Sequence, residues 1–385
     1  MRMKILIIRT FPDILQINNY NVQEIGLAKA MVMRGHECDI VLFNGKNQSR
    51  IEVISFTKEG QEYSFNIYWM KGWCFLKNGF MPGVKKLIPQ YDVIQVHEYD
   101  QIMSWQLYTK AKKPTVLYHG PYYHSYARGY NLKCQVFDKL FLWRRKYQHV
   151  PAMTKSELAA DFLREKGFAH VIPVGVGINV DNFGQFDEFR QNEEKTEDLL
   201  RMLYVGKIEE RRNVYFLIDV FRELKKRHSN LQLCLIGDGE QEYKDAFLAS
   251  VKEELNNGTI VYKEKLSQKE LPEIYAGSDL FLFTSNYDIF GMVLLEAMYY
   301  GLPVVSSMNG GASMLIRDDE NGYILNEFDL EKWVEIIDAL ACNKDKRIKL
   351  SEAAKATIME GYTWESMAGK FETVYQKAIS NFDKN

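Results

Sequence analysis

The chain has 385 residues, 46% hydrophobic and 26% charged, and this length predicts two globular domains of roughly 150–200 residues. The five cysteines show no C-x-x-C spacing, which argues against a disulfide scaffold and favours reduced thiols in a cytoplasm. The first apolar run stops at Arg9, too early for a signal peptide, and no stretch of about 18 apolar residues predicts a membrane span. The net charge of -2 is unevenly distributed: residues 1–170 have 24 basic and 14 acidic residues, a net of +10, and the remainder has 25 basic and 37 acidic residues, a net of -12. We therefore expect an anionic partner for the basic part, which could be a membrane surface, a phosphorylated acceptor or a nucleic acid.

The first half of the chain alternates predicted strands and helices. Residues 4–8 (KILII) predict a buried strand, the helical spacing in residues 21–36 a helix, and ECDIVLF a second strand. The alternation continues through YDVIQVH, QIMSWQLYTKA, PTVLYHG, SELAADFLREKG and HVIPVGV. Strand, helix and strand in this order are typical of a parallel sheet.

A second series follows residue 199. Its strands are predicted in LLRMLYVG, LQLCLIGDG, TIVYKE, LFLFTS and LPVVSS, with helices between them and at the C-terminus. We therefore expect an α/β protein with two doubly wound parallel-sheet domains, whose ligands bind beyond the carboxyl ends of the strands, in the cleft between the domains. The predicted bounds are 1–183, a charged linker at 184–199, 200–362, and a C-terminal helix at 363–385 that packs back toward the first domain.

Polar residues follow several of these strands. Lys207 and Arg212 come after a strand and a glycine, where two cations are suited to a diphosphate, although a solvated loop is the simpler alternative. Gly237 belongs to LIGDGEQ, an incomplete dinucleotide fingerprint that is also typical of an ordinary turn. His119, at the end of PTVLYH, is either a site residue or a hydrogen-bonded structural histidine.

Residues 287–305 (YDIFGMVLLEAMYYGLPVV) place two carboxylates in an apolar segment. An unpaired carboxylate in an apolar interior costs several kcal/mol, so Glu296 should be neutralised or face a polar cleft. Gly291 is expected to open a helix whose first backbone N–H groups favour an anion. A nucleotide sugar suits this set of groups: cations, helix-terminal donors, two acids and a histidine. The sequence has no D-x-D or H-E-x-x-H motif for a metal, so the cations and the helix N-terminus would stabilise the leaving diphosphate.

The spacing from Asp288 to Glu296 resembles the E-x7-E signature of retaining glycosyltransferases of family 4, which have the GT-B fold and are related to glycogen synthase and the group 1 glycosyltransferases. Other segments resemble this family in order and spacing: MVMRGHECDIV, DVIQVHEYD, GINVDNF, LIGDGE and YAGSDLFLFTS. The resemblance thus extends over nearly the whole chain.

The resemblance implies a role for each matching residue. Lys207 and Arg212 would hold the donor phosphates, Glu296 the ribose hydroxyls, Asp288 the sugar near the reacting carbon, and His119 the sugar from the other domain. The remaining donor-binding residues that it implies are Gly206, Gly237, Phe290, Gly291, Met292, Val293, Lys263, Leu266, Asn18 and Asn19. It also implies retention of configuration and no cofactor beyond the donor.

This sequence departs from the family pattern at several of these positions. Asp288 is one methylene shorter than the usual Glu, Lys207 replaces the commoner Arg, and Asn179 replaces Asp in GINVDNF. Asn18 and Asn19 stand where many members have a Gly-Gly turn. These changes affect the expected donor, for which a UDP-sugar is favoured and a GDP-sugar comes next.

Residues 131–150 indicate where the acceptor substrate could be bound. The segment has five basic residues and one acid interleaved with aromatic residues, so it either lies in an anionic membrane interface or packs on its own domain. With residues 76–90 and the basic first part, it favours a lipid-diphosphate-linked or glycan acceptor at the inner face of the plasma membrane.

The sequence leaves other classes of function open. A nucleotide-sugar 2-epimerase of the same fold and a non-catalytic scaffold of a polysaccharide-assembly complex are the main alternatives. The incomplete glycine fingerprint argues against a dinucleotide oxidoreductase, and the missing recognition motif argues against a nucleic-acid binder. The preferred interpretation is a retaining, metal-independent hexosyl- or N-acetylhexosaminyltransferase of cell-surface polysaccharide synthesis, in capsule or lipopolysaccharide.

Overall fold

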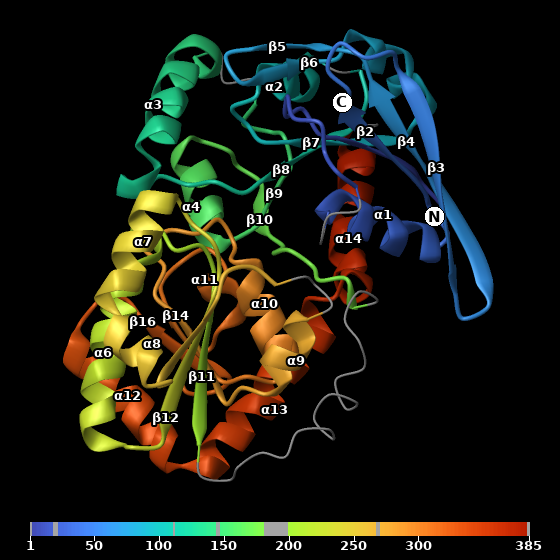
Figure 1. Ribbon diagram of the computed structural model, residues 1–385. Helices are drawn as coiled ribbons and strands as arrows, with labels where there is room; N and C mark the ends of the chain where they lie inside the picture. Colours follow the sequence, from blue (N-terminus) through green and yellow to red (C-terminus); the bar gives the residue numbers. More distant parts are fainter. Residues whose placement is uncertain are drawn as a thin grey trace. The chain divides into compact units, whose positions relative to one another are not determined.

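A computed structural model describes residues 2–17, 22–110, 112–143, 147–180, 199–266 and 270–382 (Figure 1). The chain divides into two compact units, which are described separately: unit 1 is Met1–Gly177 with Trp364–Asn385, and unit 2 is Ile178–Thr363. Asn18, Asn19 and nearly all of the predicted linker lie outside the described residues.

Unit 1 is built on an eight-stranded sheet with the order β10-β9-β8-β7-β1-β2-β4-β3. Its strands are β1 (Lys4–Ile8), β2 (Glu37–Phe43), β3 (Arg50–Lys58), β4 (Gln61–Met70), β7 (Val93–His97), β8 (Thr115–His119), β9 (Ala152–Thr154) and β10 (Val171–Pro173). All neighbours pair in parallel except β3 and β4. Buried central strands of a parallel sheet are apolar on both faces, which explains the continuous apolar run of β1.

Helices and a small hairpin complete unit 1. They are α1 (Gln23–Met33), the hairpin β5 (Trp73–Phe75) and β6 (Asn78–Phe80), the short helices η1 (Pro82–Lys86), η2 (Ile88–Gln90) and η3 (Ser125–Ala127), α2 (Ile102–Lys110), α3 (Arg128–Phe137), the π-helix η4 (Asp138–Leu142), α4 (Glu157–Glu165) and α14 (Trp364–Phe382). The order of strands reverses between β1 and β7, the place where doubly wound sheets bind ligands.

Unit 2 has a six-stranded, fully parallel sheet with the order β13-β12-β11-β14-β15-β16. Its strands are β11 (Leu200–Val205), β12 (Leu231–Ile236), β13 (Ile260–Lys263), β14 (Leu280–Phe283), β15 (Val304–Ser307) and β16 (Gly322–Leu325). In chain order this is the 3-2-1-4-5-6 arrangement of Rossmann domains, and the order reverses between β11 and β14.

The helices of unit 2 pack in pairs, α6 on α12 and α10 on α13 (Figure 1). They are η6 (Glu210–Arg212), α6 (Val214–Arg227), α7 (Gln241–Ser250), α8 (Lys252–Asn256), α9 (Leu271–Ala276), α10 (Met292–Tyr299), α11 (Ala312–Leu315), α12 (Leu330–Cys342) and α13 (Lys344–Gly361). Amphipathic α6 buries Val214, Leu217, Ile218, Phe221 and Leu224, which follow the helical period. The predicted fold class is confirmed, with the antiparallel edge strand β3 as an addition.

The last helix of the chain belongs to the first unit. In Figure 1, α14 lies beside α1, and its Tyr375 hydroxyl donates to Gln95 Oε1 at 2.6 Å. The indole of Trp364 fills space beside Gly26 and Gly177, where an added Cβ would lie 2.1 and 2.6 Å from ring atoms. Unit 1 therefore needs both ends of the described chain to complete its core.

None of the helices within the described ranges is long and apolar enough to cross a membrane.

His97, at the end of β7, makes the stability of unit 1 dependent on pH. Burial lowers its pKa to about 4, against an attraction to Glu24, whose Oε1 lies 3.3 Å from Nδ1. Because the folded pKa lies below the ordinary value of about 6.5, the unfolded chain binds the extra proton between these pH values. We expect His97 to cost on the order of 3 kcal/mol of unfolding free energy as the pH falls from about 6.5 to 4.

The measurement is urea unfolding of the wild type and of His97→Gln across this pH range. The wild type should lose more stability than the variant, because the side chain of glutamine does not titrate. The pKa of His36 is also lowered, chiefly by burial, so the difference between the two proteins is the quantity to compare. Equal losses in both proteins would show that His97 is not the titrating group.

Candidate functional site

Glycines bring the ends of three strands of unit 2 together. Gly206, after β11, donates its N–H to Ile236 O at 2.9 Å, and Gly237, after β12, donates to Lys263 O at 3.0 Å. Gly237 has φ +155°, and an added Cβ there would lie 1.8 Å from Gly206 O. Glycine at position 237 is therefore required by the close approach of these loops.

Hydrogen bonds to backbone carbonyls connect the loop after β11 to the loop after β14. Thr284 Oγ1 donates to Arg212 O at 2.9 Å, the N–H of Asn286 donates to Arg211 O at 2.8 Å, and Arg211 Nη1 donates to Tyr287 O at 2.8 Å. Since β11 and β14 are neighbours at the point of strand reversal, these contacts fix the two predicted site loops side by side.

Arg212 and Asp288 meet at this point in an ion pair through Arg212 Nη1. Their side chains are only 13% and 15% exposed. Burial lowers the pKa of Arg212, but the attraction of Asp288 outweighs it, so the net shift is upward and the guanidinium stays charged. The guanidinium also donates to Ser285 Oγ at 3.2 Å and lies over the ring of Phe283 at 5.2 Å.

The carboxylate of Asp288 also occupies the N-terminus of α10. Its Oδ1 accepts from the N–H of Gly291 at 3.0 Å and of Phe290 at 3.3 Å. Gly291 has φ +74°, a left-handed conformation that glycine adopts without strain. The expected anion at this helix N-terminus is thus present as a side chain of the protein, and a ligand would share or replace it.

Glu296 lies in α10, one to two turns beyond Gly291, with 4% of its surface exposed. Its Oε2 accepts a hydrogen bond from the hydroxyl of Tyr275 at 2.8 Å. Burial, with Glu296 nearby, raises the pKa of Tyr275 well above its ordinary value, so the phenol stays protonated and donates. The buried carboxylate is therefore paired within the protein, which answers how the apolar segment tolerates it.

The other predicted donor-binding residues of unit 2 surround this centre less closely. Met292 and Val293 begin α10 and are half-buried, Lys263 ends β13 with an exposed side chain, and Leu266 follows it, half-buried. The side chain of Lys207 is exposed, and its carbonyl accepts from the hydroxyl of Tyr204 at 2.9 Å. Arg212, Asp288 and the start of α10 are in direct contact, whereas Lys207 reaches none of them in a contact between described residues.

His119 lies at the end of β8 in unit 1 and is fully buried. Its ring stacks on Phe162 and meets Tyr99 edge-on, and Nδ1 lies 2.5 Å from Glu98 Oε2. This environment matches the alternative of a structural histidine, because no ring surface is open to a ligand.

Glu98 itself is a strained and buried residue. Its φ is +59°, which costs a residue with a side chain on the order of 1–3 kcal/mol. Burial raises its pKa, but His119, Lys155 and the N–H of Gly120 lower it to about 2, so Glu98 is charged. Glu98, Asp100 and His119 place ligand atoms within 4.8 Å of one another, but Lys155 and Lys133 lie 3.9 and 2.6 Å from the two carboxylates and favour an ion-pair network over a cation site.

The sequence analysis missed the loop that packs on Asp288. Asn309 is fully buried, and its Oδ1 accepts from the N–H of Gly311 and of Ala312 at 3.1 Å. Gly310 donates its N–H to Asp288 O at 3.0 Å, and a Cβ there would lie 2.0 Å from Ile289 O. The Asn-Gly-Gly run that begins two residues after β15 is the signal that indicates such a close approach at a strand end.

Comparisons with known proteins agree with this arrangement. Residues 185–357 match the family model "Glycosyl transferases group 1". The chain is 30% identical over 195 residues to lipopolysaccharide 1,2-N-acetylglucosaminetransferase of Salmonella typhimurium, a match that covers 48% of this chain and 50% of the relative. The chain spans about half the length of the first curated relatives that it matches.

Two solved structures resemble the fold over nearly the whole chain. Sucrose-phosphate synthase from Thermosynechococcus elongatus superposes with a TM-score of 0.74 at 15% identity, covering 99% of this chain and 100% of the other. Anabaena Alr3699/HepE in complex with UDP superposes with a TM-score of 0.72 at 16% identity, covering 97% and 100%. Residues 185–357 therefore match the group 1 glycosyl transferases, and the chain has the GT-B fold of two Rossmann-like domains.

Proposed function

We propose that this protein is a retaining glycosyltransferase that moves a hexosyl or N-acetylhexosaminyl group from a nucleotide-diphosphate sugar to a glycan or lipid-linked acceptor. A UDP-sugar is the favoured donor, and the reaction uses no metal. The product belongs to a cell-surface polysaccharide, and the enzyme works in the cytoplasm at the inner face of the membrane.

One observation carries the proposal: a permanently charged guanidinium and the two backbone amides just before α10 converge at the strand reversal of unit 2. The Arg212 guanidinium and the N–H groups of Phe290 and Gly291 all contact the carboxylate of Asp288. A diphosphate needs such fixed donors where its negative charge develops, because they require no reorganisation during the reaction. Strand reversals are also where Rossmann domains bind nucleotides.

The proposed mechanism gives each residue a distinct task. Arg212 and the exposed Lys207 stabilise the departing nucleoside diphosphate, and Glu296 accepts hydrogen bonds from the ribose hydroxyls. Asp288 accepts from a sugar hydroxyl near the reacting carbon while it keeps Arg212 oriented. The acceptor hydroxyl attacks the face from which the diphosphate leaves, and a leaving phosphate oxygen takes its proton, so the protein needs no nucleophile.

The similarities support the donor and the type of product. The solved HepE structure contains UDP, and the lipopolysaccharide relative is named as an N-acetylglucosaminetransferase. The first supports a uridine nucleotide in the donor, and the second supports a surface glycan as the product.

A peripheral membrane contact of unit 1 is the second part of the proposal. In the predicted amphipathic segment, α3 and η4 bury Cys134, Phe137 and Leu142, whereas Leu132, Val136, Leu140 and Trp143 are exposed. An exposed apolar stripe with nearby lysines is typical of a surface that contacts an anionic membrane. One face of the segment packs on unit 1, and the other face is exposed and available for an anionic membrane.

The test is a thermal-shift panel of UDP, GDP, CDP, ADP and their sugars in the presence of a chelator. A nucleotide at about 100 times its Kd should add roughly 2.7 kcal/mol of stability to the wild type. Glu296→Gln should lose most of this response, because the amide cannot replace a carboxylate that accepts two ribose hydroxyls. Tyr275→Phe is the matched control, since it disturbs the same buried hydrogen bond but keeps the carboxylate and should keep the response.

The outcomes separate the proposed function from its alternatives. Equal losses in the two variants would indicate a structural role for Glu296 alone. No response of the folded wild type to any nucleotide would favour a non-catalytic scaffold, and conversion of a bound nucleotide sugar without an acceptor would favour a 2-epimerase.

A further inference from the structure

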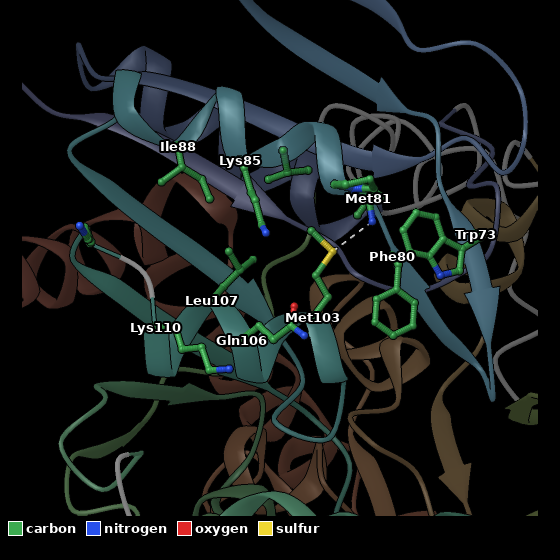
Figure 2. Close-up of a pocket in the computed structure, with 12 residues that line it drawn as sticks. Trp73, Phe80, Met81, Lys85, Ile88, Met103, Gln106, Leu107 and Lys110 are labelled. Carbon is green, nitrogen blue, oxygen red and sulfur yellow. Dashed lines mark hydrogen bonds between the residues drawn. The ribbon is translucent and has the colours of Figure 1, made fainter.

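Unit 1 contains a pocket of about 840 Å³ that the proposed donor site does not use. It lies between α2 and the short helices η1 and η2, and the hairpin residues Trp73 and Phe80 bound it on one side (Figure 2). This volume is in the range of sites for small molecules, which spans about 300–1,000 Å³. Its position in one compact unit makes it a complete site within unit 1.

The pocket has apolar walls and cationic side chains. Eight of its 12 lining residues are apolar, among them Met81, Met103 and Leu107, and the other four are Gln106 and three lysines. Figure 2 shows the apolar side chains facing one another, with Lys85 and Lys110 reaching into the same space. With one uncharged polar side chain in its lining, the pocket offers few hydrogen bonds to a sugar but a large surface to a hydrocarbon.

The cationic groups of the pocket lack acidic partners. The lining has no carboxylate, and Lys85, Lys110 and Lys112 form no ion pair within the part of the chain that the structure describes. The ammonium group of Lys110 lies 4.9 Å from the ring centroid of Trp105, a contact that does not neutralise its charge. Three cations beside an apolar pocket complement a molecule with an anionic head and an apolar tail.

Exposed apolar side chains continue the pocket onto the surface. Trp73, 53% exposed, stacks on Phe80 at the pocket wall, and Leu76 is exposed at the tip of the same hairpin. Outside the pocket lining, Trp105 of α2 contacts Phe141 of η4, and Trp143, two residues further along the chain, is 66% exposed. Tryptophans at the edge of an apolar surface with lysines nearby are typical of proteins that sit at a membrane interface.

We propose that this pocket binds one hydrocarbon chain of an anionic membrane phospholipid, with the lipid phosphate held by Lys85, Lys110 and Lys112. This inference deepens the membrane contact of the proposed function and does not depend on sugar transfer. Bound lipid would fix unit 1 to the membrane at a defined place, beside the hairpin β5–β6. The occupant is a membrane lipid because the lysines match its phosphate and the apolar walls match its chain.

The first experiment measures binding of monomeric lysophosphatidylglycerol, below its micelle concentration, by isothermal titration. The wild type should bind one molecule, and affinity should rise about fourfold for each methylene added, as expected for about 0.8 kcal/mol per buried CH₂ group, until the pocket is full. Glycerol 3-phosphate, which has the head but no chain, should not bind measurably. Equal affinity for head and whole lipid would show a free-phosphate site and overturn the proposal.

Two variants test the two halves of the pocket. Gln106→Trp, at an exposed position of the lining, should block the chain and weaken lipid binding at least tenfold while the lysines remain. Lys85→Gln with Lys112→Gln should weaken binding roughly 25-fold, about fivefold for each lysine. The matched control is Lys4→Gln with Lys29→Gln, which removes two positive charges from unit 1 away from the pocket and should bind as the wild type does.

Sedimentation with vesicles connects lipid binding to the membrane. Wild type should sediment with vesicles of phosphatidylglycerol and phosphatidylcholine and remain in solution with pure phosphatidylcholine, and Gln106→Trp should sediment less. Unchanged sedimentation of both pocket variants would overturn the proposal, because the membrane contact would then lie outside the pocket. The nucleotide response of the same variants should stay unchanged, so a failure here is distinguishable from a failure of the proposed transferase.

Discussion

Replacing Arg212 by alanine should lower sugar transfer about 100-fold to 1,000-fold, the usual loss when one fixed donor to a developing negative charge is removed. Arg212 is held by Asp288 and Ser285 at the strand reversal of unit 2, so its charge needs no rearrangement during the reaction. The measurement is release of nucleoside diphosphate from the nucleotide sugar that stabilises the wild type. Arg212→Lys should recover only part of the rate, because an ammonium cannot replace the forked contacts.

The control for this experiment is Arg222→Ala. Arg222 belongs to the same unit, on α6, and pairs with Glu254 at 2.6 Å, away from the strand ends. Its removal should leave the rate within about twofold, since exposed ion pairs contribute roughly 0–1 kcal/mol to stability and this one touches no proposed ligand. Thermal melting of all three variants separates lost activity from lost folding. A rate for Arg212→Ala within threefold of the wild type would contradict the proposed role.

Replacing Gly237 by alanine should destabilise unit 2 by about 2–6 kcal/mol. The new Cβ would lie 1.8 Å from Gly206 O, and alanine would be strained at φ +155°. Overpacking and backbone strain each cost on the order of 1–3 kcal/mol, and both act at this position. Urea unfolding measures the change.

Gly258→Ala is the matched comparison for this prediction. Gly258 also has a positive φ, +74°, but nothing lies within 4 Å of an added Cβ. Its replacement should therefore cost about 1–2 kcal/mol from backbone strain alone. Similar losses in the two variants would show that the loops after β11 and β12 can separate easily, and that Gly206 and Gly237 do not hold the strand ends together.

The sequence predicts those parts of the fold that have a local signal. Apolar runs such as Lys4–Ile8 and the helical spacing of Val214–Arg227 indicate their elements because burial in a parallel sheet and helix amphipathicity each leave a period. The hairpin of β3 and β4 was missing from the prediction, although Glu59 and Gly60 form a turn between them. Its antiparallel edge breaks the alternation of strand and helix on which the fold prediction depended.

The site shows a different limit. Asp288 and Arg212 follow strands that were predicted, so their approach could be expected once a Rossmann order was assumed. The sequence could not indicate that Asp288 holds Arg212 and the two backbone amides before α10 at once, because these contacts depend on loop conformation. His119 was placed at a strand end correctly, but its enclosure by Tyr99 and Phe162 depends on packing between distant segments.

The return of α14 to unit 1 has a consequence for the order in which the protein can be made. Residues up to Gly177 leave the ribosome first, then the whole of unit 2, and only afterwards Trp364 and Tyr375, which fill and hydrogen-bond the core of unit 1. During synthesis unit 2 can therefore fold to completion while unit 1 still exposes the apolar face that α14 will cover. The N-terminal unit is thus the last of the two to complete its core, even though it is synthesised first.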